Sequence, residues 1–564
     1  MNEALWILPS ADEAVSGLAA ELGIPLPIAR ILANRKIVDP TAAHQFLYGM
    51  LTDLHDPFLM NGMMRAKERI LQAANSGEKI LIFGDYDVDG ILSVVALSKA
   101  LRSFGADVDY YIPDRLSQGY GLKEDYVNIV LEKKSSLVIS VDCGIKAVSF
   151  VEKAKKNGID VIITDHHQPG SSLPDACAIL NPVLDTSGYP DKGLAGIGVV
   201  FKLIQTLLAE EGKSSIAPHY LKLVSIGTVA DVAPLRGENR LMVKYGLNFL
   251  ENVSNVGLKN LLANCGLTGK KISVGDVGFR IGPRINAAGR LGLTDLAVRL
   301  FFSESDEESQ TIVKKLDRLN AERQKIEERI LDNCLRLIKA NALDKKYRLL
   351  MLGCEEWHRG VIGIVASRLK DLHNRPVILF SYKDGKAFGS GRSIREFSLI
   401  DCLEDSRGLL LNYGGHRVAV GCELRMEDLA LFKSTASAFA HERISEQDLK
   451  RKLHLDAKIR FRDIDAGFVD WLALLSPFGV GNPKPLFLTE GAVVVRPPQK
   501  LGERHSKFYF KDDGLIFEAL AWQKGEWADI IKAGDYVDLV YSLQFSQFSG
   551  GERLSLSLED IKPH

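Results

Sequence analysis

Three aspartates at alternate positions, Asp85, Asp87 and Asp89, follow the apolar run of residues 81–83 and precede a predicted helix. An apolar run that ends in acids is typical of a buried parallel strand where it delivers side chains to a site. Three carboxylates this close together repel one another unless a cation neutralises them. The stretch therefore predicts a divalent metal site.

The same Asp-x-Asp-x-Asp-Gly spacing also opens an EF-hand calcium loop, which requires a bidentate glutamate at its twelfth position. Counted from Asp85, that position is Ala96, and a strand rather than a helix precedes the loop. The calcium-loop interpretation fails on both points, so the aspartates are assigned to a strand end in an α/β domain.

The bulk composition is ordinary for a globular protein, with 46% hydrophobic and 25% charged residues in 564 positions. This length predicts about three to four domains. A net charge of −1 excludes a globally basic nucleic-acid binder, so any polyanion site must be a local basic patch. The seven cysteines include no Cys-x-x-Cys pair, which argues against a disulfide framework or a thiolate zinc site.

The hydropathy of the sequence indicates in which cellular compartment the protein is expected. The sequence contains no run of about 18 apolar residues, and residues 1–20 lack the basic start and apolar core of a signal peptide. We therefore expect a cytoplasmic protein with no membrane association.

The order of apolar runs and helical patterns predicts a mixed α/β architecture. Strands expected at 79–83, 108–112, 137–141 and 161–164 alternate with helices, which is typical of a doubly wound parallel sheet. The expected parts are a mainly helical segment packing on the catalytic core (1–75), a parallel-sheet domain (76–305), a long connecting helix (306–342), a second α/β domain (343–447) and a small antiparallel barrel (448–564).

Three further ligand-type residues, Asp142, His166 and Asp231, each end an apolar or helical run. If those runs lie side by side, these residues meet Asp87 and Asp89 at one edge of the sheet. Four carboxylates and an imidazole suit two Mn²⁺ or Mg²⁺ ions about 3.5–4 Å apart, and the histidine favours manganese. Singly, a strand-end aspartate is more often a cap or turn former. Their joint occurrence at four run ends favours the metal site.

Four motifs resemble, in chain order, those of the DHH phosphoesterase superfamily: Asp87-Val-Asp89-Gly90, Val141-Asp142-Cys143-Gly144, Asp165-His166-His167 and Ala230-Asp231-Val232-Ala233-Pro234. Segments 284–290, 356–368, 389–393 and 414–416 are similar, more closely, to the RecJ family of single-strand-specific DNA exonucleases. The resemblance covers nearly the whole chain. It implies a DHH catalytic domain, a DHH-associated domain and a C-terminal oligonucleotide-binding (OB) barrel. It also implies that mononucleotides are released from a 5′ end of single-stranded DNA, with Mn²⁺ or Mg²⁺, in DNA repair and recombination.

The resemblance also implies roles for individual residues. His167 would lie beside the phosphate as an orienting group or a proton donor, and Asp142 would bridge the two ions. Asp165 is either the acceptor that orients a histidine or a helix N-cap. The implied metal ligands are Asp85, Asp87, Asp89, Asp142, His166 and Asp231. The implied substrate-binding residues are Arg115, Arg284, Arg290, Ser390, Arg392, Gly414, Gly415 and His416.

Each substrate-binding assignment has a structural alternative. The arginines are expected in glycine-flanked turns, where a planar guanidinium can bind phosphate oxygens, yet any one of them can instead form a structural salt bridge. Tyr120 could stack on a base or pack within its loop. Segment 496–511 mixes five cations with three aromatics, which fits either a single-strand-binding surface or a charged hairpin whose rings pack inward.

Two other functions stay open from the sequence alone. One is a DHH phosphodiesterase acting on short RNA or cyclic dinucleotides, and the other is a non-catalytic single-strand-binding scaffold. A helicase and a single-strand-binding protein are candidate partners. Digestion polarity and the preference for DNA over RNA rest wholly on the resemblance, because no residue pattern reads a 2′-hydroxyl.

Overall fold

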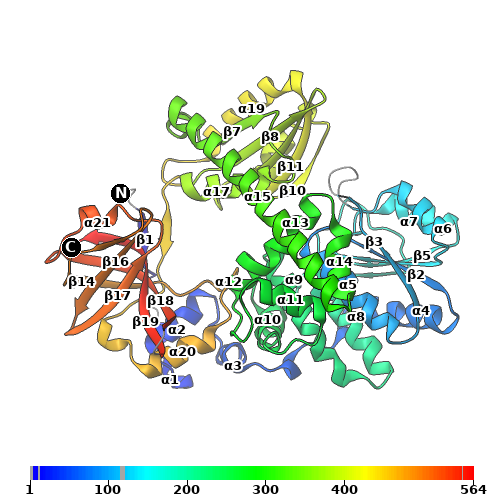
Figure 1. Ribbon diagram of the computed structural model, residues 1–564, viewed down its shortest axis with the longest axis horizontal. Coiled ribbons are helices and arrows are strands. Elements are labelled where there is room, and N and C mark those ends of the chain that lie inside the picture. The colour runs from blue at the N-terminus through cyan, green and yellow to red at the C-terminus, as the bar shows by residue number, and fades with distance from the viewer. Residues whose placement is uncertain (1–3, 10–12, 115–120, 549–550) are drawn as a thin grey trace. The chain divides into compact units, whose positions relative to one another are not determined.

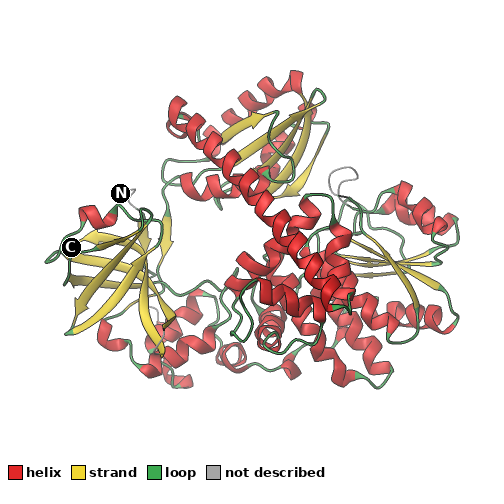
Figure 2. Cartoon of the chain, in the orientation of Figure 1, coloured by secondary structure: helices red, strands yellow, loops and turns green. Residues whose placement is uncertain are grey.

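The computed structural model describes residues 4–9, 13–114, 121–548 and 551–564 (Figure 1). The chain forms two compact units, each combining helices and strands (Figure 2). The larger unit comprises His55–Ala233 and Met242–Lys450, and the smaller comprises Met1–Leu54, Pro234–Leu241 and Arg451–His564. In the described ranges, no helix combines the length and apolar character that a bilayer span requires.

The first sheet of the larger unit is parallel, as the alternation of runs predicts. Its strand order is β3-β2-β4-β5-β6. The strands are β2 (Lys79–Gly84), β3 (Asp107–Tyr111), β4 (Leu137–Val141), β5 (Asp160–Thr164) and β6 (Ala178–Leu180). On one face, side chains such as Leu81 and Val138 pack against α6 (Val127–Glu132) and α7 (Val148–Lys156). Strands β2 and β4 are buried along most of their length, which explains why their sequences are continuous apolar runs.

The predicted connecting helix is α15 (Asp306–Asn341). The Ser305 hydroxyl accepts a hydrogen bond from the Glu308 amide at its start, and Ala342 ends it in the left-handed region at φ 48°. At 36 residues it spans about 54 Å. Its first half packs on α11 (Val256–Asn264), α13 (Gly282–Arg290) and α14 (Thr294–Phe302), and its second half on α17 (Ile362–His373). It therefore bridges two α/β layers.

The second sheet of the larger unit has the order β10-β11-β9-β8-β7. Only β7 (Leu350–Cys354) and β8 (Val377–Lys383) pair in parallel. The antiparallel strands are β9 (Lys386–Arg392), β10 (Asn412–His416) and β11 (Ala419–Arg425). α18 (Leu399–Asp405) and α19 (Leu429–Arg443) contribute to its apolar core, and α17 packs beside β8 and β9.

The smaller unit contains a closed five-stranded barrel. Its strands are β14 (Phe487–Val494), β16 (His505–Asp512), β17 (Leu515–Ala521), β18 (Tyr536–Phe548) and β19 (Gly551–Pro563). They follow one another as β14-β18-β19-β17-β16, and an additional β14–β16 pairing closes the ring. Closure removes the exposed edges of the sheet. The predicted C-terminal barrel is thus confirmed.

The N-terminal segment differs from our expectation. Residues 1–75 were predicted to pack on the catalytic core, but Ile28, Leu32 and Leu47 share one apolar core with the barrel residues Phe487 and Tyr541. These residues come from α2 (Leu26–Asn34) and α3 (Pro40–Tyr48), and α3 starts at Asp39-Pro40 as predicted. Of the α-helices described in this segment, α4 (Met63–Asn75) alone belongs to the larger unit, which begins at His55. An apolar helix face must be covered, but its pattern does not say by which domain.

The buried Arg35 side chain links helix α2 to residues 456 and 482–483 of the smaller unit. Its guanidinium donates to Asn482 Oδ1 at 2.7 Å, to the Pro483 carbonyl at 2.6 Å and to Asp456 Oδ1 at 3.2 Å. The Arg35 side chain is only 4% exposed, so the pair with Asp456 is largely withdrawn from water.

Replacing this cation should leave the Asp456 carboxylate without a charged partner. We expect Arg35→Met to lower the free energy of unfolding of the smaller unit by about 3–5 kcal/mol. Urea denaturation followed by tryptophan emission measures this, since four of the five tryptophans lie in this unit. The exposed Lys484→Met is the control and should change stability by less than about 0.5 kcal/mol. Equal stability of the two variants would contradict the role of Arg35.

Candidate metal centre and phosphate site

The parallel sheet delivers the predicted acids to one edge. Asp85 and Asp87 follow β2, Asp142 follows β4, and His166 and His167 follow β5. Neighbouring parallel strands end at the same edge, so side chains more than fifty positions apart in sequence meet there. Asp231 joins them from the C-terminal end of α9 (Leu221–Ala230).

Backbone amides fix two of the aspartates. Asp87 Oδ1 accepts hydrogen bonds from the amides of Asp89 (3.0 Å) and Gly90 (3.1 Å), which caps α5 (Val88–Arg102). The buried Asp89 carboxylate accepts from the amides of Gly196 (2.8 Å) and Ile197 (2.9 Å), the first residues of α8 (Gly196–Glu210). The positive end of α8 thus helps to hold a carboxylate that burial would otherwise disfavour.

Three overlapping groups bring ligand atoms within 4.8 Å of one another. They are Asp85, Asp87 and Asp142; Asp89, His166 and Asp231; and Asp142, His166 and His167. Because Asp142 and His166 each belong to two groups, the site has the layout of neighbouring ion positions with shared ligands. All six predicted ligands are therefore brought together.

Two atoms at the centre indicate a cation most directly. His166 Nε2 lies 3.1 Å from Asp142 Oδ1 and 4.0 Å from Asp231 Oδ2. Within the described part of the chain, neither Asp142 Oδ1 nor His166 Nε2 has a hydrogen-bond partner, although both are buried. Two buried lone pairs that face a common point without a proton donor fit a divalent metal. Carboxylates with one imidazole suit Mn²⁺ or Mg²⁺.

The electrostatics agree with this assignment. Burial and the neighbouring Asp87 raise the pKa of Asp89 to about 7. Burial, followed by the charges of Asp89 and Asp87, also raises the pKa values of Asp142 and Asp231 well above their usual range. The pKa of His166 falls to about 4, chiefly through burial and then through His167, so its ring is neutral and can act as a ligand. A bound cation would remove the cost of ionising the acids.

Asp165 is the acceptor that orients a histidine, and the helix N-cap alternative is wrong, because residues 165–177 form no helix. Its Oδ1 accepts from the backbone amides of His166 (2.7 Å) and His167 (3.0 Å), and lies 2.7 Å from His167 Nδ1. Its Oδ2 accepts from the amide of Ile145 at 2.9 Å. Burial alone would lower the pKa of His167, but the hydrogen bond and charge of Asp165 outweigh it and raise this pKa. Asp165 therefore orients His167 with Nε2 directed away from it.

A close backbone approach shapes the pocket around Asp142. This residue adopts φ 59°, in the left-handed region that aspartate tolerates better than most side chains. A Cβ added to Gly196 would lie 2.6 Å from Asp142 Oδ1 and 2.9 Å from its Cβ, so only glycine fits there. Sequence reasoning missed Gly196, because its role depends on a partner 54 positions away.

Three predicted phosphate-binding residues gather around the start of α17. Arg290 Nη1 donates to the Gly360 carbonyl at 2.9 Å. A Cβ built on Gly363, in the first turn of α17, would lie 2.8 Å from Ser390 Oγ and 3.3 Å from Arg392 Nη2. A helix N-terminus, a hydroxyl and two guanidinium groups form a suitable environment for a phosphate.

The other predicted substrate residues have different surroundings. Arg284 and Arg290 lie on α13 rather than in turns, and the guanidinium of Arg284 pairs with Asp317 at 2.8 Å. Gly414, Gly415 and His416 end strand β10 instead of forming a turn. Burial, then the charges of His167 and Lys146, lower the pKa of His416, so its ring lies within electrostatic reach of His167. Arg115 and Tyr120 lie outside the described residues.

In the barrel segment 496–511, two aromatic rings pack inward and the third is left at the surface. Phe508 and Phe510 are buried in the barrel core, so the structural alternative holds for them. Tyr509 is only partly buried, with the Arg496 guanidinium 4.6 Å and the Lys507 ammonium 5.3 Å from its ring centroid. One aromatic ring between two cations is therefore left on the outer surface.

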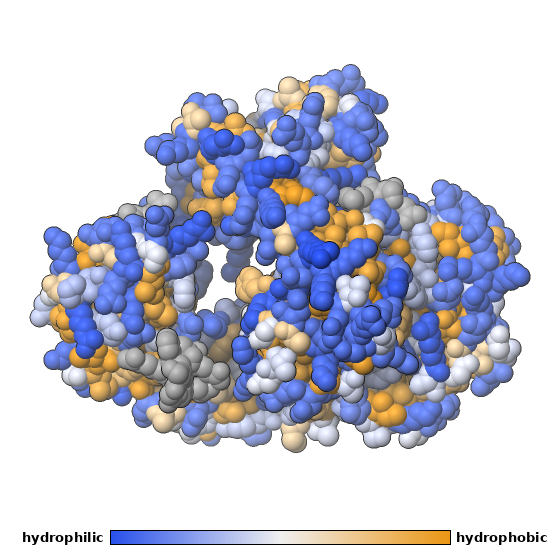
Figure 3. All heavy atoms as spheres, in the orientation of Figure 1, coloured by the Kyte–Doolittle hydropathy of each residue, from blue (hydrophilic) through white to orange (hydrophobic). Residues whose placement is uncertain are grey.

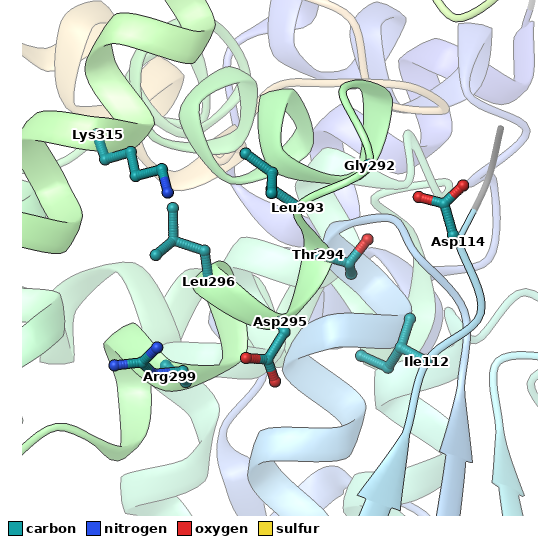
Figure 4. Close-up of a pocket in the computed structure, with 9 residues that line it drawn as sticks. All are labelled: Ile112, Asp114, Gly292, Leu293, Thr294, Asp295, Leu296, Arg299 and Lys315. Atoms are coloured by element: carbon teal, nitrogen blue, oxygen red, sulfur yellow. The ribbon is translucent and has the colours of Figure 1, made fainter. Parts of the chain in front are cut away.

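A surface pocket of about 300 Å³ lies beside the turn at Gly292, two residues after Arg290. Figure 4 shows the residues that line it. Asp114, Gly292 and Thr294 line one side, and Lys315 of α15 lines the other. A Cβ on Gly292 would come within 2.8 Å of Asp114 Oδ2, so the turn is closed tightly against the end of β3. None of the six metal ligands lines this pocket, and the chemistry is assigned to the strand edge instead.

Comparison with known proteins agrees with these assignments. The DHH family, N-terminal domain, matches residues 79–228, the DHHA1 domain residues 346–442 and the RecJ OB domain residues 455–560. The single-stranded-DNA-specific exonuclease RecJ of Bacillus subtilis is 36% identical over 98% of this chain and 70% of its own. The Escherichia coli protein of that name is 33% identical over 100% of both chains.

Solved structures give the same result. The crystal structure of RecJ in complex with Mn²⁺ from Thermus thermophilus has a TM-score of 0.85 and 32% identity. The similarity covers 99% of this chain and 80% of that chain. The Mg²⁺ complex of the same protein has a TM-score of 0.79.

The parallel sheet with its acidic edge, the long helix and the second sheet define a metal-dependent phosphoesterase of the DHH class. With the barrel and the full-length relatives, the chain belongs to the RecJ family of exonucleases.

The Gly196–Asp142 contact can be tested by a matched pair of substitutions in one helix. We expect Gly196→Ala to weaken Mn²⁺ binding about 10- to 100-fold, because the new methyl group displaces Asp142. Gly198→Ala is the control, since its Cβ would have no neighbour closer than 3.4 Å. Isothermal titration with Mn²⁺ measures both, and thermal unfolding checks the fold. Equal Mn²⁺ affinity in the two variants would contradict the assignment.

Proposed function

We propose that this chain is a single-stranded-DNA-specific exonuclease that releases mononucleotides from a 5′ end by metal-dependent hydrolysis of phosphodiester bonds. The observation that carries the proposal is the meeting of six metal-ligand side chains in the same compact unit as a phosphate-binding group at the start of α17. The barrel in the same chain supports a nucleic acid as the substrate. The relatives' names specify single-stranded DNA, and the 5′ polarity follows from the family resemblance.

The metal ligands are proposed to be Asp85, Asp87, Asp89, Asp142, His166 and Asp231, with Asp142 shared between two ions. When bound, Mn²⁺ or Mg²⁺ supplies the Lewis acidity that activates water and stabilises charge on the phosphate. His167, held through Nδ1 by Asp165, would contact the scissile phosphate through Nε2 as an orienting group or a proton donor.

The 5′-terminal phosphate is proposed to bind between Arg290, Ser390 and Arg392 at the positive end of α17. This fixes one end of the strand while the next phosphodiester reaches the metal centre, so one nucleotide is measured off at each cleavage. Gly414, Gly415 and His416 would approach the same nucleotide from β10. Arg284 has a structural ion pair with Asp317, which weakens its assignment to substrate binding.

The cellular setting follows from the same proposal. All seven cysteines are free thiols, which suits a reducing compartment such as the cytoplasm. A nuclease restricted to single strands needs duplex to be opened first, so a helicase and a single-strand-binding protein are the proposed partners in DNA repair and recombination.

Metal dependence, polarity and strand preference can be tested in one digestion experiment. We expect 5′- and 3′-labelled single strands to be degraded from the 5′ end with Mn²⁺ or Mg²⁺, and no degradation with a chelator. Asp142→Asn should reduce the rate at least about 100-fold. Asp160→Asn, at the opposite end of β5, should keep the wild-type rate. Degradation of blunt duplex as fast as single strands would refute the proposal.

The phosphate site makes a separate prediction about the terminal group. We expect Arg392→Ala to slow digestion of 5′-phosphorylated strands about 10- to 100-fold, while 5′-hydroxyl strands change little, because a charge-assisted contact to the phosphate is lost. The exposed Arg395→Ala, three residues away, should behave as wild type. Steady-state rates on the two substrates measure this effect. An equal loss on both would argue against a 5′-phosphate contact.

A further inference from the structure

We propose that Phe279 stacks on a base of the single-stranded substrate beside the metal centre, with Lys270 and Lys271 binding the adjoining phosphates. This inference rests on the proposed function and identifies a further contact for the same substrate. None of these three residues belongs to the predicted site.

Phe279 stands out among the apolar side chains. On the face shown in Figure 3, apolar residues are scattered among hydrophilic ones, as on most protein surfaces. Phe279 is 84% exposed, more than any other large apolar side chain in the described residues, and no aromatic or cationic partner covers its ring there. Burying a phenylalanine normally stabilises a fold, so this one contributes little to folding in the free protein.

The backbone presents Phe279 in an unusual way. It is the central residue of a single π-helical turn, Val277–Ile281, inserted between a short helical turn (Val274–Asp276) and α13. π turns inside α-helices are rare and occur often at functional sites. Val277 and Ile281 on this turn are fully buried, so the turn is anchored on one side and presents Phe279 on the other.

The same helical run borders the metal centre. A Cβ on Gly282, the residue after the π turn, would lie 3.4 Å from the Cβ of Ala230, the neighbour of the ligand Asp231. Farther along, a Cβ on Gly289 would lie 2.2 Å from the carbonyl of Tyr86, between Asp85 and Asp87. This helical run therefore passes from the metal ligand Asp231 to the segment that carries Asp85 and Asp87.

The residue after Asp231 is also exposed and apolar, and its backbone conformation is restrained. Val232 is 61% exposed and adopts φ 65°, a conformation that β-branched residues rarely tolerate. Such backbone strain persists only where the surroundings enforce it, and it concentrates at functional sites. Val232 lies two residues after the end of α9, and Phe279 lies on the π turn that packs against α9.

The charges beside Phe279 indicate which kind of ligand would bind there. Lys270 and Lys271 are exposed, and in the described chain neither forms an ion pair. Their loop is closed against the π turn, because Arg280 Nη2 donates to the Cys265 carbonyl and Cys265 Sγ donates to the Arg280 carbonyl at 3.5 Å. Arg280 itself pairs with Asp276 at 3.1 Å. Proteins that bind single strands without sequence preference combine exposed aromatic rings, on which bases stack, with cations that bind the phosphates. Phe279 and the two lysines offer this combination.

Binding of an oligothymidylate 20-mer tests the proposal in an Asp142→Asn background, which prevents digestion during the measurement. We expect Phe279→Ala and Phe279→Leu each to weaken binding about 5- to 100-fold, because both remove the ring that stacks on a base. Phe279→Trp should bind within about 3-fold of the parent chain, and DNA should quench the emission of the added indole. Lys270→Gln with Lys271→Gln should reduce the salt dependence of binding.

Leu372→Ala is the matched control, since Leu372 is also an exposed apolar residue (59%) on a helix of the same unit. It should bind as the parent does. Parental affinity in Phe279→Ala or Phe279→Leu, or an unquenched indole in Phe279→Trp, would overturn the stacking contact while leaving the exonuclease assignment intact. If the parent chain itself binds no single strand, the proposed function fails instead.

Discussion

The mutual repulsion of carboxylates at one buried sheet edge is the constraint on which the rest of the larger unit depends. Asp89, Asp142 and Asp231 are each made harder to ionise by burial and by neighbouring carboxylates, among them Asp87 in every case. A fold that concentrates such groups is costly without a compensating positive charge. Part of that charge comes from the backbone at the start of α8, and a divalent cation would supply the remainder.

The surrounding architecture follows from the need to hold those groups in register. Parallel strands place their carboxyl ends at one edge, and the helices that follow them present amide groups there. Close backbone approaches then set distances that side chains alone could not maintain, as at Gly196 beside Asp142 and Gly289 beside Tyr86. The long helix α15 carries the second sheet and its phosphate-binding residues within the same compact unit.

Much of this could be predicted from local patterns. Four strands of the parallel sheet, the connecting helix predicted over 306–342 and the C-terminal barrel were recognisable from periodicity and turn residues. Other predictions were wrong because local patterns do not name the partner. Helices α2 and α3 pack on the barrel instead of the catalytic core, and Arg284 lies on a helix and pairs with Asp317. Phe508 and Phe510 alternate with Tyr509, so the pleat buries two of three aromatics that looked equivalent in sequence.

The sequence by itself determined which chemistry is available, because the aspartates and histidines at strand ends are ligand types whatever the fold around them. Only the tertiary structure decided that Asp142 and His166 face each other across 3.1 Å, that Gly196 leaves room for Asp142 and that Arg290, Ser390 and Arg392 gather at one helix start. The physical reason is that strand and helix periodicities act over a few residues, whereas these contacts depend on how segments far apart in the chain pack together.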